Sequence, residues 1–417
     1  MTPGLRSGKL KLSGQKKVKT VQVLKLPVKK ATVVYAYAMW DGERAWLRRR
    51  VGVVISGDRI VRILEETSPD NLKLSFPEAQ AISLPSLTLL PGLVDCHIHL
   101  AMDGHNFQVS LQGWGDPAAL WQRIACDLQE TLRHGITAVR DGGDLRRIGL
   151  WTRNLVRLGK LEGPTVVATG QALGRHGMYG SFLGPGVTSL GEALGFIRNL
   201  YRQGVDQVKV VASGIVSLNR FGKVGPLQFP DADLKEIVQA AHSYGLKVMA
   251  HASSDQAVRA CVGAGVDSIE HGYFASSATL AAIADTPTWW VPTLIPVAVR
   301  DDYPGCDPDV VRRTWQLHLQ KVAEAHRLGV NLAVGTDAGS PGVPHGGRYL
   351  DELRLLSRAG LPSLDLLRAA TINGARLLGL EQDIGTLATG KKALMIGVAG
   401  NPLENLDTLS NIHFLAY

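Results

Sequence analysis

The chain of 417 residues is 45% hydrophobic and 20% charged, the balance of a globular protein with room for one large domain and a smaller one. Its formal net charge of +8 is concentrated at one end, because residues 1–30 hold nine Lys or Arg and no acid. The other 36 of the 45 basic residues are matched by 37 acidic ones. We therefore expect residues 1–30 to be a basic, flexible leader, and we expect neither a nucleic-acid nor a membrane partner.

The cysteines indicate a reducing compartment. Four are present, widely spaced and without a C-x-x-C pair, so neither a disulfide framework nor a thiolate zinc cluster is predicted. An A-Y-A triplet in the apolar stretch 32–40 resembles a signal-peptidase site, which would favour secretion. That stretch contains two tyrosines and leads into further strand-like sequence, so we expect a cytoplasmic protein. No run reaches the roughly 18 apolar residues that a membrane helix needs.

The first elements, within residues 31–86, are β-rich. A-T-V-V-Y-A-Y-A is followed by a D-G-E turn at 41–43 and then by V-G-V-V-I-S-G-D-R-I-V-R-I, which alternates and turns as strands do. Near the other end, G-T-L-A-T-G-K-K-A-L-M-I-G-V at 385–398 returns to strand character. We expect residues 380–417 to rejoin residues 31–90 in one small sheet domain.

After Pro91 the pattern changes to strands alternating with helices. Apolar runs predict eight strands, near 93–98, 136–140, 165–169, 207–212, 246–251, 267–271, 289–295 and 331–336. The segments between them have helical spacing, as in Leu120, Ile124, Leu128 and Leu132. Eight parallel strands that are each followed by a helix predict a (β/α)8 TIM barrel, α/β in class, over residues 91–379.

Metal-type ligands follow five of these predicted strands. His97 and His99 are two residues apart, which places both on one face of a strand. The later ones are Lys209, His251, His271 and Asp337. In a barrel of this kind the carboxyl ends of the strands converge, so these side chains are expected to meet.

This ligand set predicts a metal centre. An isolated H-x-H pair is as well explained by ordinary buried histidines, but two more histidines and an aspartate at later strand ends make that reading poor. Nitrogen and oxygen ligands without thiolate suit Zn²⁺, with Mn²⁺, Fe²⁺ or Co²⁺ as substitutes. Lys209 cannot bind a cation as an ammonium, but a buried neutral amine can take up CO₂ and become a carbamate that bridges two metals.

Several strings together resemble the amidohydrolase superfamily. They are L-L-P-G-L-V-D-C-H-I-H-L, V-K-V-V-A-S-G, V-M-A-H-A, D-S-I-E-H-G, G-T-D-A-G and A-A-T-I-N-G-A-R-L-L-G-L. The chain is most similar to its imidazolonepropionase-like branch, which includes prolidase-like dipeptidases and ochratoxin-hydrolysing amidases, over roughly residues 31–405. The resemblance implies a composite β-sandwich beside the barrel, built from 31–90 and 380–417. Prolidase-like members carry a carboxylated lysine where this chain has Lys209.

The resemblance also implies roles for the ligands. His97, His99 and Asp337 would bind the buried metal, His251 and His271 the second, and carboxylated Lys209 with a hydroxide would bridge the two. Asp337 would accept the proton of the nucleophile and pass it to the leaving nitrogen. His176, in G-R-H-G, matches a histidine of the family's G-G-H-G loop and is the candidate donor to the oxyanion, unless it is an ordinary loop histidine.

Substrate contacts are expected from loops beyond the strand ends. Candidates for binding a substrate carboxylate or lining its pocket are Tyr179, Arg220, His345 and Arg348. Asp141, at the end of the second strand, is expected to be a structural hydrogen-bond acceptor rather than a catalyst. The expected partner is a small-molecule substrate, and the expected assembly is a homo-oligomer.

The predicted function is metal-dependent hydrolysis of an amide bond. The expected substrates are an N-acyl amino acid, a dipeptide such as Xaa-Pro, or an amide-linked aromatic toxin. Two alternatives remain open: a cyclic-amide hydrolase or deaminase on the same metal platform, and a scaffold homologue that has lost activity. A deaminase usually uses one metal ion, so metal stoichiometry separates it from the first prediction.

Overall fold

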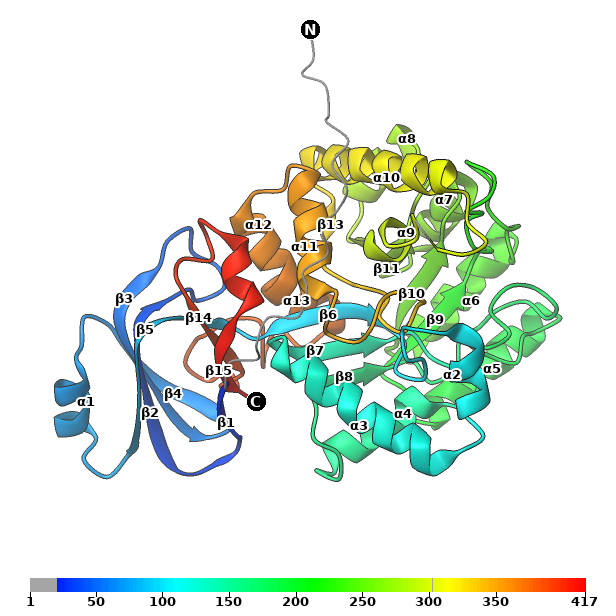
Figure 1. The fold of residues 1–417 in the computed structure, drawn as a ribbon. Coiled ribbons are helices and arrows are strands. Elements are labelled where there is room, and N and C mark those ends of the chain that lie inside the picture. The colour runs from blue at the N-terminus through cyan, green and yellow to red at the C-terminus, as the bar shows by residue number, and fades with distance from the viewer. Residues whose placement is uncertain (1–20, 302) are drawn as a thin grey trace, which may run out of the picture.

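The computed structural model describes residues 21–301 and 303–417. Both ends of this part of the chain contribute to one seven-stranded sheet with the order β1-β15-β14-β5-β2-β3-β4, seen on the left of Figure 1. Its strands are β1 (Gln22–Leu24), β2 (Val28–Met39), β3 (Arg48–Gly57), β4 (Arg59–Leu64), β5 (Gln80–Pro91), β14 (Met395–Ala399) and β15 (Ile412–Ala416). The C-terminal strands β14 and β15 pair in this sheet with β5 and β1, and helix α1 (Pro69–Ser75) lies at its outer edge.

The predicted boundary of the leader is wrong at its C-terminal side. Residues 22–24 and 28–30 are strand, because β1 pairs in parallel with β15 and buries Leu24. Lys29 and Lys30 are both exposed at the start of β2. Their positive charge made this segment resemble a solvated tail in the sequence, although it is a strand. The rest of the predicted leader, residues 1–20, lies outside the described residues.

The strands expected to form a β-sandwich are hydrogen-bonded into one continuous sheet. A β-sandwich would have two separate sheets. The reason is the length of β2 and β5, which have 12 residues each. β5 pairs with β2 in parallel from Gln80 onward and with β14 in antiparallel over its last residues. One long strand therefore joins both halves around a shared apolar cluster that includes Val53, Leu89 and Phe414.

The remaining strands are parallel and lie where the apolar runs predicted them. They are β6 (Leu93–Ile98), β7 (Ile136–Asp141), β8 (Thr165–Ala168), β9 (Gln207–Val211), β10 (Lys247–Ala252), β11 (Ser268–His271), β12 (Trp289–Val291) and β13 (Asn331–Leu332). They form a three-stranded sheet, β6-β7-β8, and a five-stranded sheet, β13-β12-β11-β10-β9. Bridges join these sheets at both seams, Leu173 with Val210 and Ile98 with Ala338.

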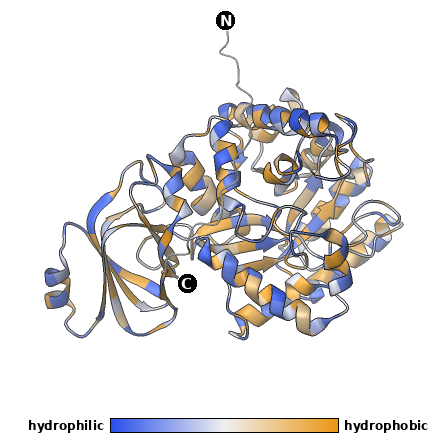
Figure 2. Ribbon diagram, in the orientation of Figure 1, coloured by the Kyte–Doolittle hydropathy of each residue, from blue (hydrophilic) through white to orange (hydrophobic). Residues whose placement is uncertain are grey.

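Helices cover the outside of the parallel strands (Figure 1). Most show hydrophobic and hydrophilic colours side by side in Figure 2, as expected for helices that pack one face on strands. The helices after β6 are α2 (Phe107–Gly113), α3 (Pro117–Arg133), α4 (Ile148–Arg157), α5 (Leu190–Arg202), α6 (Asp231–Ser243), α7 (Asp255–Ala264), α8 (Ser277–Ala284), α9 (Ile295–Ala298), α10 (Pro308–Leu328), α11 (Tyr349–Arg358), α12 (Ser363–Arg368), the π-helix η1 (Ala369–Asn373) and α13 (Gly374–Leu378). The 3-10 helix η2 (Leu406–Ser410) instead contacts β14 and α11.

The seam beside β6 is held by a buried carboxylate. Asp95 accepts hydrogen bonds from the backbone N–H of His97 and from both the N–H and the hydroxyl of Thr336, the last at 2.6 Å. Because Thr336 follows β13, this contact ties the first parallel strand to the last. The two segments that carry His97, His99 and Asp337 are thereby held side by side.

Two further expectations concern the whole chain. All four cysteines are free, as their spacing predicted. Among the described residues, none of the helices has the length and apolar character required to pass through a bilayer.

Candidate metal centre and substrate cavity

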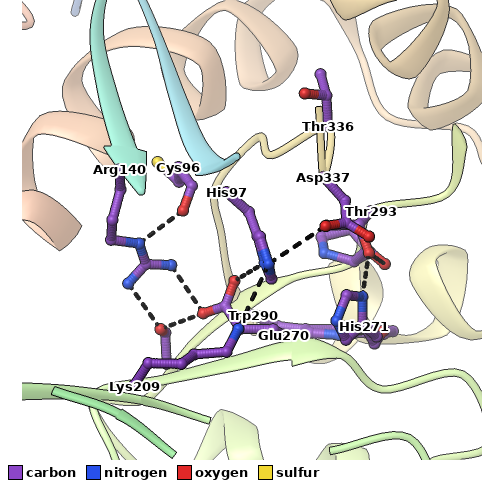
Figure 3. A network of polar contacts seen from close by, with 12 residues as sticks. Cys96, His97, Arg140, Lys209, Glu270, His271, Trp290, Thr293, Thr336 and Asp337 are labelled. Carbon is purple, nitrogen blue, oxygen red and sulfur yellow. Dashed lines mark hydrogen bonds and ion pairs between the residues drawn. The ribbon is translucent and has the colours of Figure 1, made fainter. Parts of the chain in front are cut away.

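The predicted metal ligands converge at the carboxyl ends of the parallel strands (Figure 3). Nε2 of His97 lies 3.6 Å, and Nε2 of His99 3.4 Å, from Oδ1 of Asp337. The potential ligand atoms of these three residues all lie within 4.8 Å of one another. The structure thus brings Asp337 beside His97 and His99, which lie about 240 positions earlier in the chain.

The other candidates surround the same point. The ring centroid of His271 is 5.0 Å from that of His97 and 4.5 Å from that of His251. Nζ of Lys209 is 3.4 Å from Nε2 of His97. All six predicted ligands therefore belong to one buried cluster.

Two of the ligands owe their orientation to unusual backbone. His271 has φ 71° and Asp337 has φ 56°, in the left-handed region that residues other than glycine seldom adopt. His271 is the last residue of β11, whereas Asp337 lies in the loop that follows β13. Such backbone is costly and is found where the surrounding structure enforces it, often at functional sites.

Burial keeps the imidazoles neutral. Desolvation, reinforced by the charge of Lys209, lowers the pKa of His99 and of His251 to about 3, and burial likewise holds the pKa of His97 and of His271 well below the usual value. Neutral imidazole is the form that binds metal. The histidines thus have a free nitrogen lone pair at neutral pH.

Burial also changes the pKa of Lys209 and of Asp337, and in each case it favours the uncharged form. Burial lowers the pKa of Lys209 to about 8, although the nearby carboxylates Glu270 and Asp337 raise it. Burial raises the pKa of Asp337 to about 6, against a hydrogen bond from Ser340 and the charge of Lys209. The side chains therefore include an amine that loses its proton readily and a carboxylate that can take one up.

The donor set fits divalent metal ions. Neutral imidazoles and a carboxylate within 4.8 Å of one another match the nitrogen and oxygen ligands of Zn²⁺ sites. An ammonium on Lys209 would oppose a cation at this place, whereas a carbamate on the same nitrogen would add two oxygen ligands. The fit of the whole cluster therefore depends on the state of Lys209.

A buried charge network behind the ligands was not predicted. Glu270 is fully buried and accepts a hydrogen bond from Nδ1 of His97 at 2.7 Å. Its other oxygen accepts from Arg140 at 2.7 Å and from Ser268 at 2.5 Å (Figure 3). A carboxylate on Nδ1 fixes the tautomer of His97 and leaves Nε2 free for a metal. The signal was present in D-S-I-E-H-G, since Ser268 and Glu270 share one face of β11.

Asp141 has the structural role that its position predicted. Its carboxylate accepts the backbone N–H of Leu100 at 2.9 Å and of Gly143 at 3.0 Å. Both bonds hold the loops that follow β6 and β7. Burial raises the pKa of Asp141 to about 7.

A cavity of about 480 Å³ opens onto the ligand cluster, a size suited to a small organic molecule. It reaches His99, Lys209, His251, His271 and Asp337 at its floor. Its walls are largely apolar or aromatic and are formed by Met102, Phe107, Tyr179, Phe182, Leu183, Ile215, Val216, Leu218, Tyr273, Pro296, Val297, Tyr303 and Pro341, with Ser253, Arg300, Cys306 and Ser340 as the other lining residues. The sequence had singled out Tyr179 among these wall residues.

The other predicted substrate and oxyanion residues do not line the cavity. His176 and Arg220 are exposed in turns, and the ring of His345 is buried with Nε2 2.8 Å from the carbonyl oxygen of Met102. Arg348 forms an ion pair with Asp351 at 3.1 Å. These residues follow strand ends in sequence, but the paths of their loops carry them elsewhere. The polar cavity residues that were missed include Tyr273 and Arg300.

One buried carboxylate positions the cavity wall at α9. Glu352 accepts the backbone N–H groups of Leu294 and Ile295 at 2.9 and 2.8 Å. Burial raises its pKa to about 8, although these hydrogen bonds lower it. Glu352 of α11 thus holds the start of the segment that leads to Arg300.

We expect the stabilising effect of Glu352 to depend on pH. The unfolded chain releases this proton near the ordinary value of 4.5, whereas the folded protein keeps it up to about pH 8. In that interval the folded state binds more protons, so its free energy of unfolding falls as pH rises. The test is thermal unfolding of wild type and Glu352→Gln at pH 5.5 and 8.5. Relative to the variant, the wild type should be less stable at pH 8.5 than at pH 5.5. A difference that is equal at both values would contradict this.

Comparison with known proteins extends the resemblance to the whole of this region. A model of the amidohydrolase family matches residues 88–416. Ochratoxinase of Aspergillus niger is 27% identical over 416 residues, which cover 90% of this chain and 83% of the relative. An imidazolonepropionase of Sphingopyxis alaskensis is 24% identical and covers 76% of this chain and 79% of the relative.

A solved structure is similar in fold as well. A Xaa-Pro dipeptidase with bound methionine in its active site superposes with a TM-score of 0.80 at 26% identity, over 92% of this chain and 97% of that one. The family match spans more than three quarters of the present sequence and includes all six clustered ligands. The chain therefore belongs to the amidohydrolase family.

Proposed function

We propose that this protein is a metal-dependent hydrolase that cleaves an amide bond in a small molecule. Membership of the amidohydrolase family makes it a hydrolytic enzyme of carbon–nitrogen bonds, so the reading as an inactive scaffold is set aside. The observation that carries the proposal is the convergence of His99, His251, His271, Lys209 and Asp337 at the floor of one cavity, with His97 buried beside them. Candidate substrates are N-acyl amino acids, dipeptides such as Xaa-Pro, and amide-linked aromatic compounds.

We infer that the eight parallel strands form a closed (β/α)8 barrel over residues 91–379. The support is the ring of contacts that continues across both seams, from β8 to β9 through Leu173 and from β13 to β6 through Ala338. We further propose that residues 31–90 and 380–417, with 22–30 added, form the composite second domain. In such a barrel the chemistry lies at the carboxyl ends of the strands, where the ligands were found.

The proposed cofactors are two divalent metal ions, with Zn²⁺ the best match to the donors. His97, His99 and Asp337 would hold one ion, His251 and His271 the other, and a carbamate on Lys209 would lie between them. Metal ions bound here would act as Lewis acids toward the substrate carbonyl and would lower the pKa of water. The low pKa of Lys209, about 8, favours carbamate formation because CO₂ reacts with the neutral amine.

Asp337 is the proposed proton carrier. A pKa of about 6 lets its carboxylate accept a proton from the attacking water and return it to the leaving nitrogen. Ser340 donates a hydrogen bond to Oδ2 at 2.8 Å, which leaves Oδ1 facing the histidines. We propose that the proton moves on this carboxylate, close to where the scissile bond would lie.

Tyr179 is a better-placed donor to the oxyanion than His176. Its ring lies in the cavity wall with its centroid 5.4 Å from that of His251. Burial raises the pKa of its hydroxyl above the usual value, so the proton remains available for donation. His176 remains a prediction that would need its exposed turn to move.

The relatives support hydrolysis of a carbon–nitrogen bond but do not identify the substrate. Ochratoxinase, imidazolonepropionase and the Xaa-Pro dipeptidase differ in named substrate, so the substrate class within this family has to come from the residues of the cavity. The expected homo-oligomer, the cytoplasmic location and the absence of nucleic-acid or membrane partners stay predictions.

The first test combines metal analysis with hydrolysis. We expect about two equivalents of divalent metal per chain and release of the acid from N-acyl amino acids or dipeptides, because the floor has ligands for two ions. Chelation should abolish turnover, and Zn²⁺ should restore it. One equivalent of metal together with ammonia release from a ring substrate would favour the deaminase alternative. Metal-independent turnover would refute the proposal.

A further inference from the structure

Arg300 is a cationic side chain in the wall of the cavity that the proposed chemistry leaves without a task. It follows α9 and lines the cavity together with Tyr179 and Asp337. Its Nε is buried without a hydrogen-bond partner among the described residues. No described acid lies within ion-pair distance of it, and the neighbouring Asp301 pairs with Arg312 at 3.5 Å.

The charge of Arg300 acts on the reacting end of the cavity. It lowers the pKa of Asp337 and of Tyr179, in both cases against the larger effect of burial. Its guanidinium lies over the ring of Tyr303, 5.4 Å from the centroid. Stacking of this kind orients a guanidinium while leaving its N–H edge free for an anion.

The rest of the lining explains why an anion belongs there. The other cation at the cavity is Lys209, which lies at the floor beside His97, and the acid of the lining is Asp337. A half-buried guanidinium in a largely apolar wall is costly unless a partner satisfies it. A carboxylate is the partner whose two oxygens match the fork of an arginine.

Another part of the cavity wall is apolar. Phe107 and Phe182 meet edge to face, with centroids 4.9 Å apart, and belong to a cluster with Met102 and Leu183. Phe182 follows β8 and Arg300 follows β12, and these strands are four apart in the order β6 to β13. In the proposed closed barrel these two residues would approach the cavity from opposite sides.

We propose that Arg300 binds the free carboxylate of the substrate and thereby sets the substrate class. This inference rests on the proposed amide hydrolysis. The substrate is then an N-acylated amino acid or dipeptide with a free C-terminal carboxylate, whose apolar acyl group packs against Phe107 and Phe182. Capping the carboxylate removes the group that Arg300 recognises.

Binding and turnover test this separately. Calorimetric titration of the Zn²⁺-loaded protein uses N-benzenesulfonyl-L-leucine, which carries no hydrolysable amide, and its carboxamide. Turnover is followed as benzoate release from N-benzoyl-L-leucine and N-benzoyl-L-leucinamide. Both pairs are measured with wild type, Arg300→Met, Arg300→Lys and the control Arg313→Met, whose exposed guanidinium stacks on Phe221 outside the cavity.

Wild type should bind the carboxylate about 30-fold more tightly than the carboxamide, as a charge-assisted hydrogen-bonded pair predicts. Arg300→Met should remove this preference, Arg300→Lys should retain part of it, and Arg313→Met should keep it. In turnover the effect should fall mainly on KM for the carboxylate substrate.

Equal affinity of wild type for both ligands, or a preference that survives Arg300→Met, would overturn the assignment. Because the binding ratio is measured without hydrolysis, it decides the role of Arg300 even if no benzoate is released. Absence of benzoate release from either substrate with intact binding would instead count against the proposed amide hydrolysis.

Discussion

Lys209→Ala is expected to lose most of its bound metal and to hydrolyse N-acyl amino acids at least about 10³-fold more slowly than wild type. The physical reason is ligand count. Without the carbamate, His97, His99, His251, His271 and Asp337 suffice for one ion but not for two. Metal content by plasma mass spectrometry and steady-state rates measure the two effects.

The control for Lys209→Ala is Lys235→Ala, which removes an exposed lysine from α6 and should change neither quantity. Short-chain carboxylates such as acetate or propionate should restore part of the metal and of the rate, because their oxygens can occupy the place of the carbamate. Circular dichroism would establish that the variant folds. Full metal content with unchanged turnover would remove the dinuclear hypothesis.

Asp337→Asn is expected to keep part of its metal and to lower kcat by about 10²- to 10⁴-fold, the usual contribution of a positioned general acid–base group. The amide still offers an oxygen to a metal, but it cannot carry the proton between water and the leaving nitrogen. The measurement is kcat beside metal content, so that loss of chemistry is separated from loss of metal. A wild-type rate in this variant would exclude Asp337 as the proton carrier.

The pH profile gives the same residue a second test. As a base, Asp337 must be deprotonated, so the wild-type rate should fall as pH decreases through the pKa of its carboxyl group, which bound cations would hold below the value of about 6 that it has without them. This acid limb should disappear in Asp337→Asn. Ser340→Ala removes a hydrogen bond that lowers the pKa of Asp337, so the limb should move to higher pH. A limb unaffected by either substitution would belong to another group.

Arrangement of the parallel strands was predictable because their signals are local. Runs such as V-K-V-V and V-M-A-H-A are apolar on both faces, as expected of buried parallel strands, and each strand lies within a few residues of its prediction. The small sheet was predictable for a similar reason, except at its beginning. There the basic residues, Lys29 and Lys30 among them, gave no strand pattern in the sequence. β1 and the start of β2 are strands because they pair with β15 and β3.

The residues on loops were harder to predict. His176, Arg220 and Arg348 follow strand ends as Tyr179 does, yet Tyr179 alone of these four lines the cavity. A strand directs its side chains by alternation, whereas a loop's path depends on what it packs against. Arg300 was missed for this reason, since its segment is held by Glu352 from α11, more than 50 residues away.

What the sequence by itself determined was the set of strands, the six candidate ligands at or near their ends and the kinship with amidohydrolases, because each depends on short-range pattern and residue chemistry. The tertiary structure decided the pairing of Glu270 with His97 and Arg140, the left-handed backbone of His271 and Asp337, and the exposure of His176. It also placed Arg300 in the wall of the cavity. These properties arise from contacts between segments far apart in the chain, and no local pattern records which distant side chain will satisfy a buried charge.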